Sequence, residues 1–147
     1  MNENFREVYE QYLGMSKDQR FDYANRAAGA VVEFFRQRGV KDEDSASFVL
    51  NLIGVAMGAD GYVTQGEVDL LNRLFGWNYQ PKDLGEFAGN AATVDNLRAI
   101  DKIVDNMDDD AKLAACIVVL AVITADGDLN ENEEAAFEIL LADHFDF

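Results

Sequence analysis

The stretch ADGYVTQGE at residues 59–67 returns as ADGDLNENE at residues 125–133. Both copies follow the pattern Asp-Gly-x-aliphatic-x-x-x-Glu. The surrounding segments 48–76 and 114–142 align with each other without a gap. In each segment a strongly apolar run precedes the Asp-Gly pair, and an amphipathic run follows it. The repeat therefore predicts two hairpins, each made of an apolar helix, a turn at the Asp-Gly pair (the DG turn) and a second helix.

Helical periodicity also dominates the rest of the chain. Apolar residues recur at helical spacing over residues 16–39 and 94–107, and no run alternates polar and apolar residues for long. The single proline in 147 residues favours uninterrupted helices. We predict an all-α fold of seven to eight helices in one domain, residues 1–147. The two hairpins would pack about a pseudo-two-fold axis as a compact bundle, with a peripheral N-terminal helix over residues 1–14.

Capping motifs mark several helix ends. In a capping box, the residue before the helix and the residue three positions later bond each other's backbone N–H groups. Three boxes are present: Ser16 with Gln19, Thr64 with Glu67, and Asn130 with Glu133. Pro81 is expected near a helix start, and Gly76 is expected to end the helix that follows the first DG turn.

The charge distribution limits the classes of partner. The formal net charge is −16, with seven basic and six acidic residues in 1–41 but five basic and 22 acidic residues in 42–147. Nucleic-acid binding needs clustered basic residues, so we expect no nucleic-acid partner. The acidic excess favours a cation or a basic protein as partner, although it also fits simple solubility.

The remaining sequence features argue against membrane insertion and against an enzyme. The longest apolar run, residues 113–123, is too short to span a bilayer, and residues 1–14 lack the features of a signal peptide. Cys116 is the only cysteine, which fits a cytoplasmic setting and a core position. His144 is the only histidine and is expected as a cation at a helix end. No nucleophile motif or phosphate-binding loop is present, so no catalytic residue is predicted.

The DG turn has a purely structural explanation. Asp and Gly suit a tight turn after a helix, and an aliphatic residue then returns to the core. Glu67 and Glu133 fall at the third position of the next helix, where a carboxylate caps the helix and favours its dipole. This interpretation requires no ligand.

A metal site is the competing interpretation. The pattern equals the second half of an EF-hand calcium loop, but the positions that should hold the first ligands are apolar or neutral in both copies, so neither copy is an EF-hand. Two half-loops that face each other would bring together several carboxylates, whose repulsion Ca²⁺ or Mg²⁺ would relieve. The predicted ligands are Asp60, Glu67, Asp126, Asp128 and Glu133. The hypothesis requires both turns to lie at the same end of the molecule.

An apolar helix followed by a DG turn, repeated in an acidic helical chain of this length, resembles the TerB-like family of tellurite-resistance proteins and the related N-terminal domain of DjlA-type J-proteins. The resemblance covers roughly residues 15–145. It implies metal binding by the paired acidic motifs, no enzymatic reaction, and a role as a partner-binding module in stress-type complexes. The first copy has fewer acidic residues than the second.

Two functional hypotheses follow. The first is a cytoplasmic module that binds a divalent cation and a protein partner. The second is a metal-independent acidic interaction domain whose DG turns are only structural.

Two other features bear on packing and partners. The small-x-x-x-small patterns at 54–58 and 85–89 predict close helix packing, and the aromatic residues within 75–81 are expected to cap the core or, if exposed, to mark a partner site.

Overall fold

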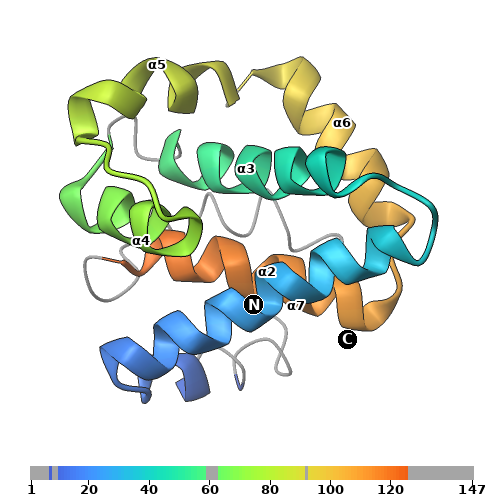
Figure 1. Ribbon diagram of the computed structural model, residues 1–147, viewed down its shortest axis with the longest axis horizontal. Helices are drawn as coiled ribbons and strands as arrows, with labels where there is room; N and C mark the ends of the chain where they lie inside the picture. The colour runs from blue at the N-terminus through green and yellow to red at the C-terminus, as the bar shows by residue number, and fades with distance from the viewer. Residues whose placement is uncertain (1–6, 8–9, 59–62, 92, 126–147) are drawn as a thin grey trace.

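The structure is a computed structural model that describes residue 7 and residues 10–58, 63–91 and 93–125. All regular secondary structure in these residues is helical, which confirms the predicted all-α class (Figure 1). The helices described from end to end are α2 (Lys17–Arg36), α3 (Asp42–Gly58), α4 (Gln65–Phe75), α5 (Pro81–Ala91), α6 (Val94–Asp105) and α7 (Asp109–Ile123). Most of the second hairpin, including the cap pair Asn130 and Glu133, lies outside the described residues. The pseudo-two-fold arrangement therefore stays a prediction.

The two apolar helices form the centre of the molecule, as their composition predicts. Every residue from Ala114 to Val122 in α7 is buried, and in α3 the buried residues run almost without a break from Phe48 to Met57. A helix that is apolar all round needs protein on all sides. Accordingly α7 packs against both α2 and α3, and α5 covers another side of α3 (Figure 1).

Local sequence signals set the helix ends. Thr64 and Glu67 form the predicted capping box at the start of α4, and Ser16 and Gln19 form another at the start of α2. Helix α4 ends at Gly76, whose φ of 70° lies in the left-handed region that glycine enters without strain. These ends confirm the predicted boundaries.

Close helix packing occurs at one of the two small-x-x-x-small patterns. A Cβ built at Gly54 would lie 2.7 Å from the Cβ of Ala91 and 3.0 Å from the Phe87 ring, so α3 and α5 approach as closely as glycine allows. The prediction for residues 85–89 is wrong. Gly85 and Gly89 are exposed and have no atom within 4 Å of such a Cβ, because α5 turns Leu84, Ala88 and Ala91 to the core instead.

The segment before α2 is anchored by one aromatic residue. Residues 10–13 are helical, and Tyr12 is buried in the core although a peripheral position was expected for residues 1–14. The Arg20 side chain holds the link to α2 by donating to the carbonyl oxygens of Leu13 and Met15.

Candidate functional site

Glu67 is the one predicted metal ligand that the structure describes. Asp60, Asp126, Asp128 and Glu133 lie outside the described residues. The Glu67 side chain is 5% exposed. Its Oε1 accepts hydrogen bonds from the backbone N–H of Thr64 at 2.8 Å and from the Thr64 hydroxyl at 3.0 Å. The Glu67 N–H in turn donates to the Thr64 hydroxyl oxygen at 3.3 Å. The carboxylate therefore acts first as a cap of α4.

The two apolar helices end at the same end of the molecule. Helices α3 and α7 pack together and run in the same direction, so that the C-terminal ends of both helices lie beside α4 (Figure 1). Gly66 and Asp69, which follow the first DG turn, line the same cavity as Thr124 and Ala125, which immediately precede Asp126. The described residues that flank the two DG turns therefore lie at one end of the molecule, and the turns themselves lie outside the described residues.

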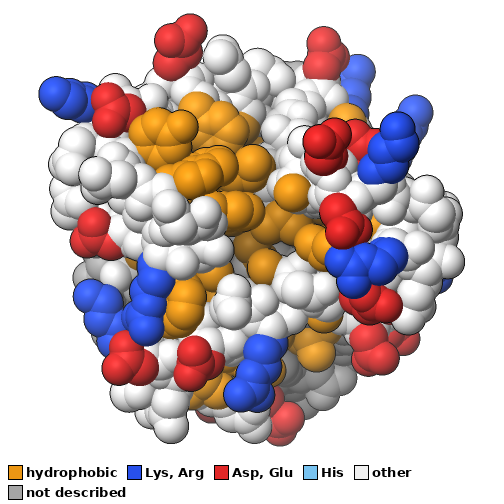
Figure 2. All heavy atoms as spheres, viewed as in Figure 1, with side chains coloured by type: hydrophobic (Ala, Val, Ile, Leu, Met, Phe, Trp, Pro, Cys, Tyr) orange, Lys and Arg blue, Asp and Glu red, His pale blue; other side chains and the backbone are white. Residues whose placement is uncertain are grey.

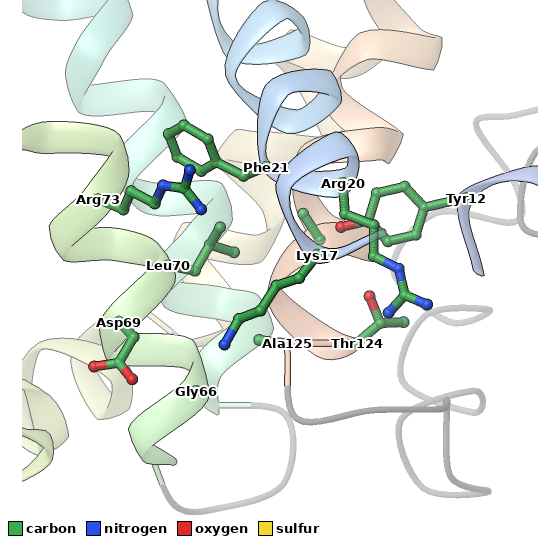
Figure 3. A pocket seen from close by; sticks show the side chains of 11 residues that line it. Tyr12, Lys17, Arg20, Phe21, Gly66, Asp69, Leu70, Arg73, Thr124 and Ala125 are labelled. Carbon is green, nitrogen blue, oxygen red and sulfur yellow. The ribbon is translucent and has the colours of Figure 1, made fainter. Parts of the chain in front are cut away.

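That cavity, which we call the turn-end pocket, has a volume of about 230 Å³. Its lining combines an apolar wall with basic side chains from α2 and α4 (Figure 3). The lining residues are Tyr12, Lys17, Arg20, Phe21, Gly66, Asp69, Leu70, Arg73, Ala121, Thr124 and Ala125. Among the described residues that line the pocket, three are cations and one is a carboxylate, which is a positive balance within a strongly acidic chain.

Two of these cations are fixed by contacts with neighbouring groups. Arg73 donates to Asp18 at 3.2 Å and stacks over the Phe21 ring at 3.8 Å. Arg20 is held by the carbonyl oxygens of Leu13 and Met15, and no carboxylate among the described residues forms an ion pair with it. Lys17 extends from α2 toward the end of α7 (Figure 3), and within the described residues no carboxylate forms an ion pair with it.

Tyr12 joins the pocket to the end of α7. Burial raises the pKa of the Tyr12 phenol, while a hydrogen bond with Thr124 and the charge of Arg20 lower it in part. The Thr124 hydroxyl also donates to the carbonyl oxygen of Leu120 at 2.7 Å. The last residues before the second DG turn are therefore tied to the N-terminal part of the chain.

The basic side chains of the turn-end pocket offer positive charge that does not come from a metal ion. If the two turns bring their carboxylates together, Lys17, Arg20 and Arg73 would supply part of the compensating positive charge from the turn-end pocket. Across the described ranges, no group of three or more His, Cys, Asp or Glu side chains forms a metal cluster. The sequence did not predict that basic side chains line this pocket, although Lys17 and Arg20 belong to the segment 1–41 in which basic residues are concentrated.

The other singled-out residues divide between core and surface. Cys116 is fully buried, as predicted, and burial raises the pKa of its thiol well above the ordinary value, which keeps it unreactive. His144 lies outside the described residues. Trp77 and Tyr79 are exposed, which favours the partner-site interpretation of the aromatic segment.

Comparison with known proteins identifies no relative. No protein-family model, curated protein or solved structure matches this chain significantly. The resemblance to the TerB-like family therefore stays a prediction. None of the helices in the described part of the chain is both long enough and apolar enough to cross a bilayer.

The Glu67 cap leads to a testable prediction. Glu67→Ala removes both bonds to Thr64, and we expect it to lower the free energy of unfolding by about 1–2 kcal/mol. Glu67→Gln keeps an acceptor oxygen and should cost less. Urea denaturation followed by circular dichroism measures both. Asp69→Ala, an exposed change two residues further along α4, is the control and should stay within about 0.5 kcal/mol. Equal losses for Glu67→Ala and Asp69→Ala would contradict the cap.

Proposed function

We propose that this chain is a non-enzymatic, TerB-like helical module that binds a divalent cation at its paired DG turns and a protein partner elsewhere on its surface. The proposed setting is the cytoplasm, in a stress or tellurite-resistance type of complex. The observation that carries the cation proposal is the common end of α3 and α7, where Gly66 and Asp69 share a pocket with Thr124 and Ala125. Nucleic acid is not proposed as a partner, given the net charge of −16.

The donor chemistry suits a hard cation. Asp60, Glu67, Asp126, Asp128 and Glu133 would offer carboxylate oxygens, which Ca²⁺ and Mg²⁺ prefer. Glu67 would serve both as cap and as ligand, since a carboxylate has two oxygens and several lone pairs. The cation would supply positive charge that draws the two turns together, and binding would stabilise the folded state.

A metal-independent acidic interaction domain is the second candidate. It is supported by Glu67, whose capping bonds to Thr64 explain the spacing of the first copy without a ligand. It is also supported by Lys17, Arg20 and Arg73, which bring positive charge to the turn-end pocket. In this case the turns would be architecture only, and binding would occur on other surfaces.

Calorimetric titration separates the two candidates. Chelator-treated protein is titrated with Ca²⁺ and then with Mg²⁺, beside the double variant Glu67→Gln/Glu133→Gln. Cation binding predicts a saturable signal that the double variant weakens by at least the roughly 10–100-fold that loss of an outer-shell partner costs. Glu86→Gln, which makes the same change at an exposed carboxylate of α5 away from the turn-end pocket, is the matched control and should bind as the parent does. A folded protein that binds neither ion would refute the cation proposal and leave the second candidate.

A further inference from the structure

A second cavity lies between α3, α5 and the loop that joins α4 to α5. Its volume is about 270 Å³, and we call it the aromatic groove. Its lining residues are Leu50, Trp77, Tyr79, Asp83, Leu84 and Phe87. Apolar side chains gather on this side of the molecule over the region between α5 and α3 (Figure 2). None of the described residues lines both the groove and the turn-end pocket.

The aromatic side chains of the groove are held in place before any partner arrives. The Trp77 ring stacks on Phe75 at 5.1 Å between ring centres and meets the Tyr79 ring edge-on at 5.4 Å. The Asn72 amide accepts from the Tyr79 N–H and donates to the Tyr79 carbonyl oxygen, both at 2.9 Å. The Trp77 N–H donates to the Asn72 carbonyl oxygen at 3.0 Å. A rigid loop lowers the entropy lost on binding.

This rigid loop nevertheless leaves two large aromatic side chains in solvent. Trp77 is 40% exposed and Tyr79 is 41% exposed. Trp and Tyr are the residues most enriched among those that dominate binding energy at protein interfaces. An aromatic pair that is fixed, exposed and beside an apolar cavity therefore has the properties of an interface anchor.

The charge around the groove defines the partner. Among the described residues that line it, Asp83 carries the charge, and Asp83 Oδ2 caps α5 by accepting from the Gln80 N–H at 2.9 Å. The chain from residue 42 onward has a net charge of −17. A basic partner is attracted by this field, whereas a second copy of the chain or an anionic surface is repelled.

Arginine is the cation that lies over aromatic rings elsewhere in the described part of this protein. Arginine side chains lie over Phe34 at 3.5 Å, over Phe21 at 3.8 Å and over Tyr12 at 5.6 Å. Within the described residues, no cation lies over the Trp77 ring. Trp is the aromatic residue that binds a guanidinium most strongly by cation–π attraction.

We propose that the aromatic groove binds a segment of a partner protein that carries arginine next to leucine. The arginine would stack on Trp77 and pair with Asp83, and the leucine would enter the cavity between Leu50, Leu84 and Phe87. This proposal rests on the partner-binding part of the proposed function and does not require a cation at the DG turns.

The single tryptophan of the chain makes the groove directly observable. Because Trp77 is the only Trp, the intrinsic fluorescence of the protein reports on this site. The probe is the peptide acetyl-Arg-Leu-Leu-Arg-Leu-Leu-Arg-amide, titrated in the presence of EDTA. We expect a saturable change in Trp emission. The matched peptide with Glu in place of each Arg should give none.

Three variants test the assignment through the anisotropy of a fluorescein-labelled arginine peptide. Trp77→Ala should raise the Kd about 30-fold, the change that corresponds to an interface hot spot of about 2 kcal/mol. Asp83→Asn keeps an oxygen for the α5 cap and should weaken binding several-fold, less so at high salt. Ile103→Ala removes another exposed apolar side chain, on α6, and should leave the Kd unchanged.

The proposal is overturned by any of three results from protein that circular dichroism finds folded. These are no response to the arginine peptide, equal affinity for the glutamate peptide, or an unchanged Kd for Trp77→Ala. Because the titration contains EDTA, such a failure is separate from the outcome of the calcium titration. Calcium binding without peptide binding would refute the groove and leave the cation proposal intact.

Discussion

Replacing Leu120 by alanine is expected to lower the free energy of unfolding by about 2–5 kcal/mol, near the upper end for a site that cannot collapse. The Leu120 side chain is 0% exposed in α7, the helix that packs against both α2 and α3. Its neighbours along α7, Val119 and Ala121, are buried as well. Because α2 and α3 both pack against α7, the side chains around Leu120 have little freedom to fill the cavity that its removal leaves. Urea denaturation followed by circular dichroism measures the free energy of unfolding and its dependence on the urea concentration.

A loss of this size is a large fraction of the total free energy of unfolding of a domain, which is roughly 5–15 kcal/mol. Ile103→Ala provides the control, since the Ile103 side chain is 36% exposed on α6 and its truncation leaves no enclosed cavity. We expect it to stay within about 0.5 kcal/mol. If Leu120→Ala cost no more than Ile103→Ala, α7 would not be the centre of the folded core.

The sequence predicted the features that depend on neighbouring residues. Continuous apolar runs identified α3 and α7 as the buried helices, because a helix without a polar face has no stable place at the surface. The pair Thr64 and Glu67 predicted the start of α4, and Gly76 predicted its end. Pro81 stands at the first residue of α5, where its missing N–H costs nothing.

Features that depend on distant residues could not be predicted in the same way. Arg73 and Asp18 are 55 positions apart in the chain and form an ion pair only because α2 and α4 meet. The turn-end pocket, and the positive charge within it, is a product of that meeting. Likewise the pattern at residues 85–89 fits close packing, but it does not say which face of α5 turns inward, and Gly85 and Gly89 fall on the exposed face.

The candidate metal site is intermediate between these cases. The repeated pattern predicted that Glu67 occupies the third position of a helix and caps its start, and the capping box confirms that part. Whether the carboxylates of two turns surround one cation depends on distances across the molecule, which spacing along the chain does not contain. The parallel course of α3 and α7 supports convergence of the turns, and the calcium titration tests it.

Gly54→Val is expected to destabilise the protein by up to about 3 kcal/mol, as overpacking of a close helix contact does. A Cβ at this position already lies 2.7 Å from the Cβ of Ala91, and valine adds two further methyl groups toward α5. Helices α3 and α5 must separate or Phe87 must move, since its ring lies 3.0 Å from the same Cβ. The change is measured as a lower midpoint of urea denaturation.

Gly89→Ala is the matched control. Gly89 is exposed in α5 with open space around an added Cβ, so alanine should raise stability by about 0.5–1 kcal/mol through its better helix propensity. The two substitutions, one in α3 and one in α5, are therefore expected to change the stability in opposite directions. Because Phe87 also lines the aromatic groove, Gly54→Val should lower the affinity for the arginine peptide as well. Gly89→Ala should leave that affinity unchanged. If Gly54→Val left both stability and peptide affinity unchanged, α3 and α5 would not be in close contact, and the groove built between them would lose its structural basis.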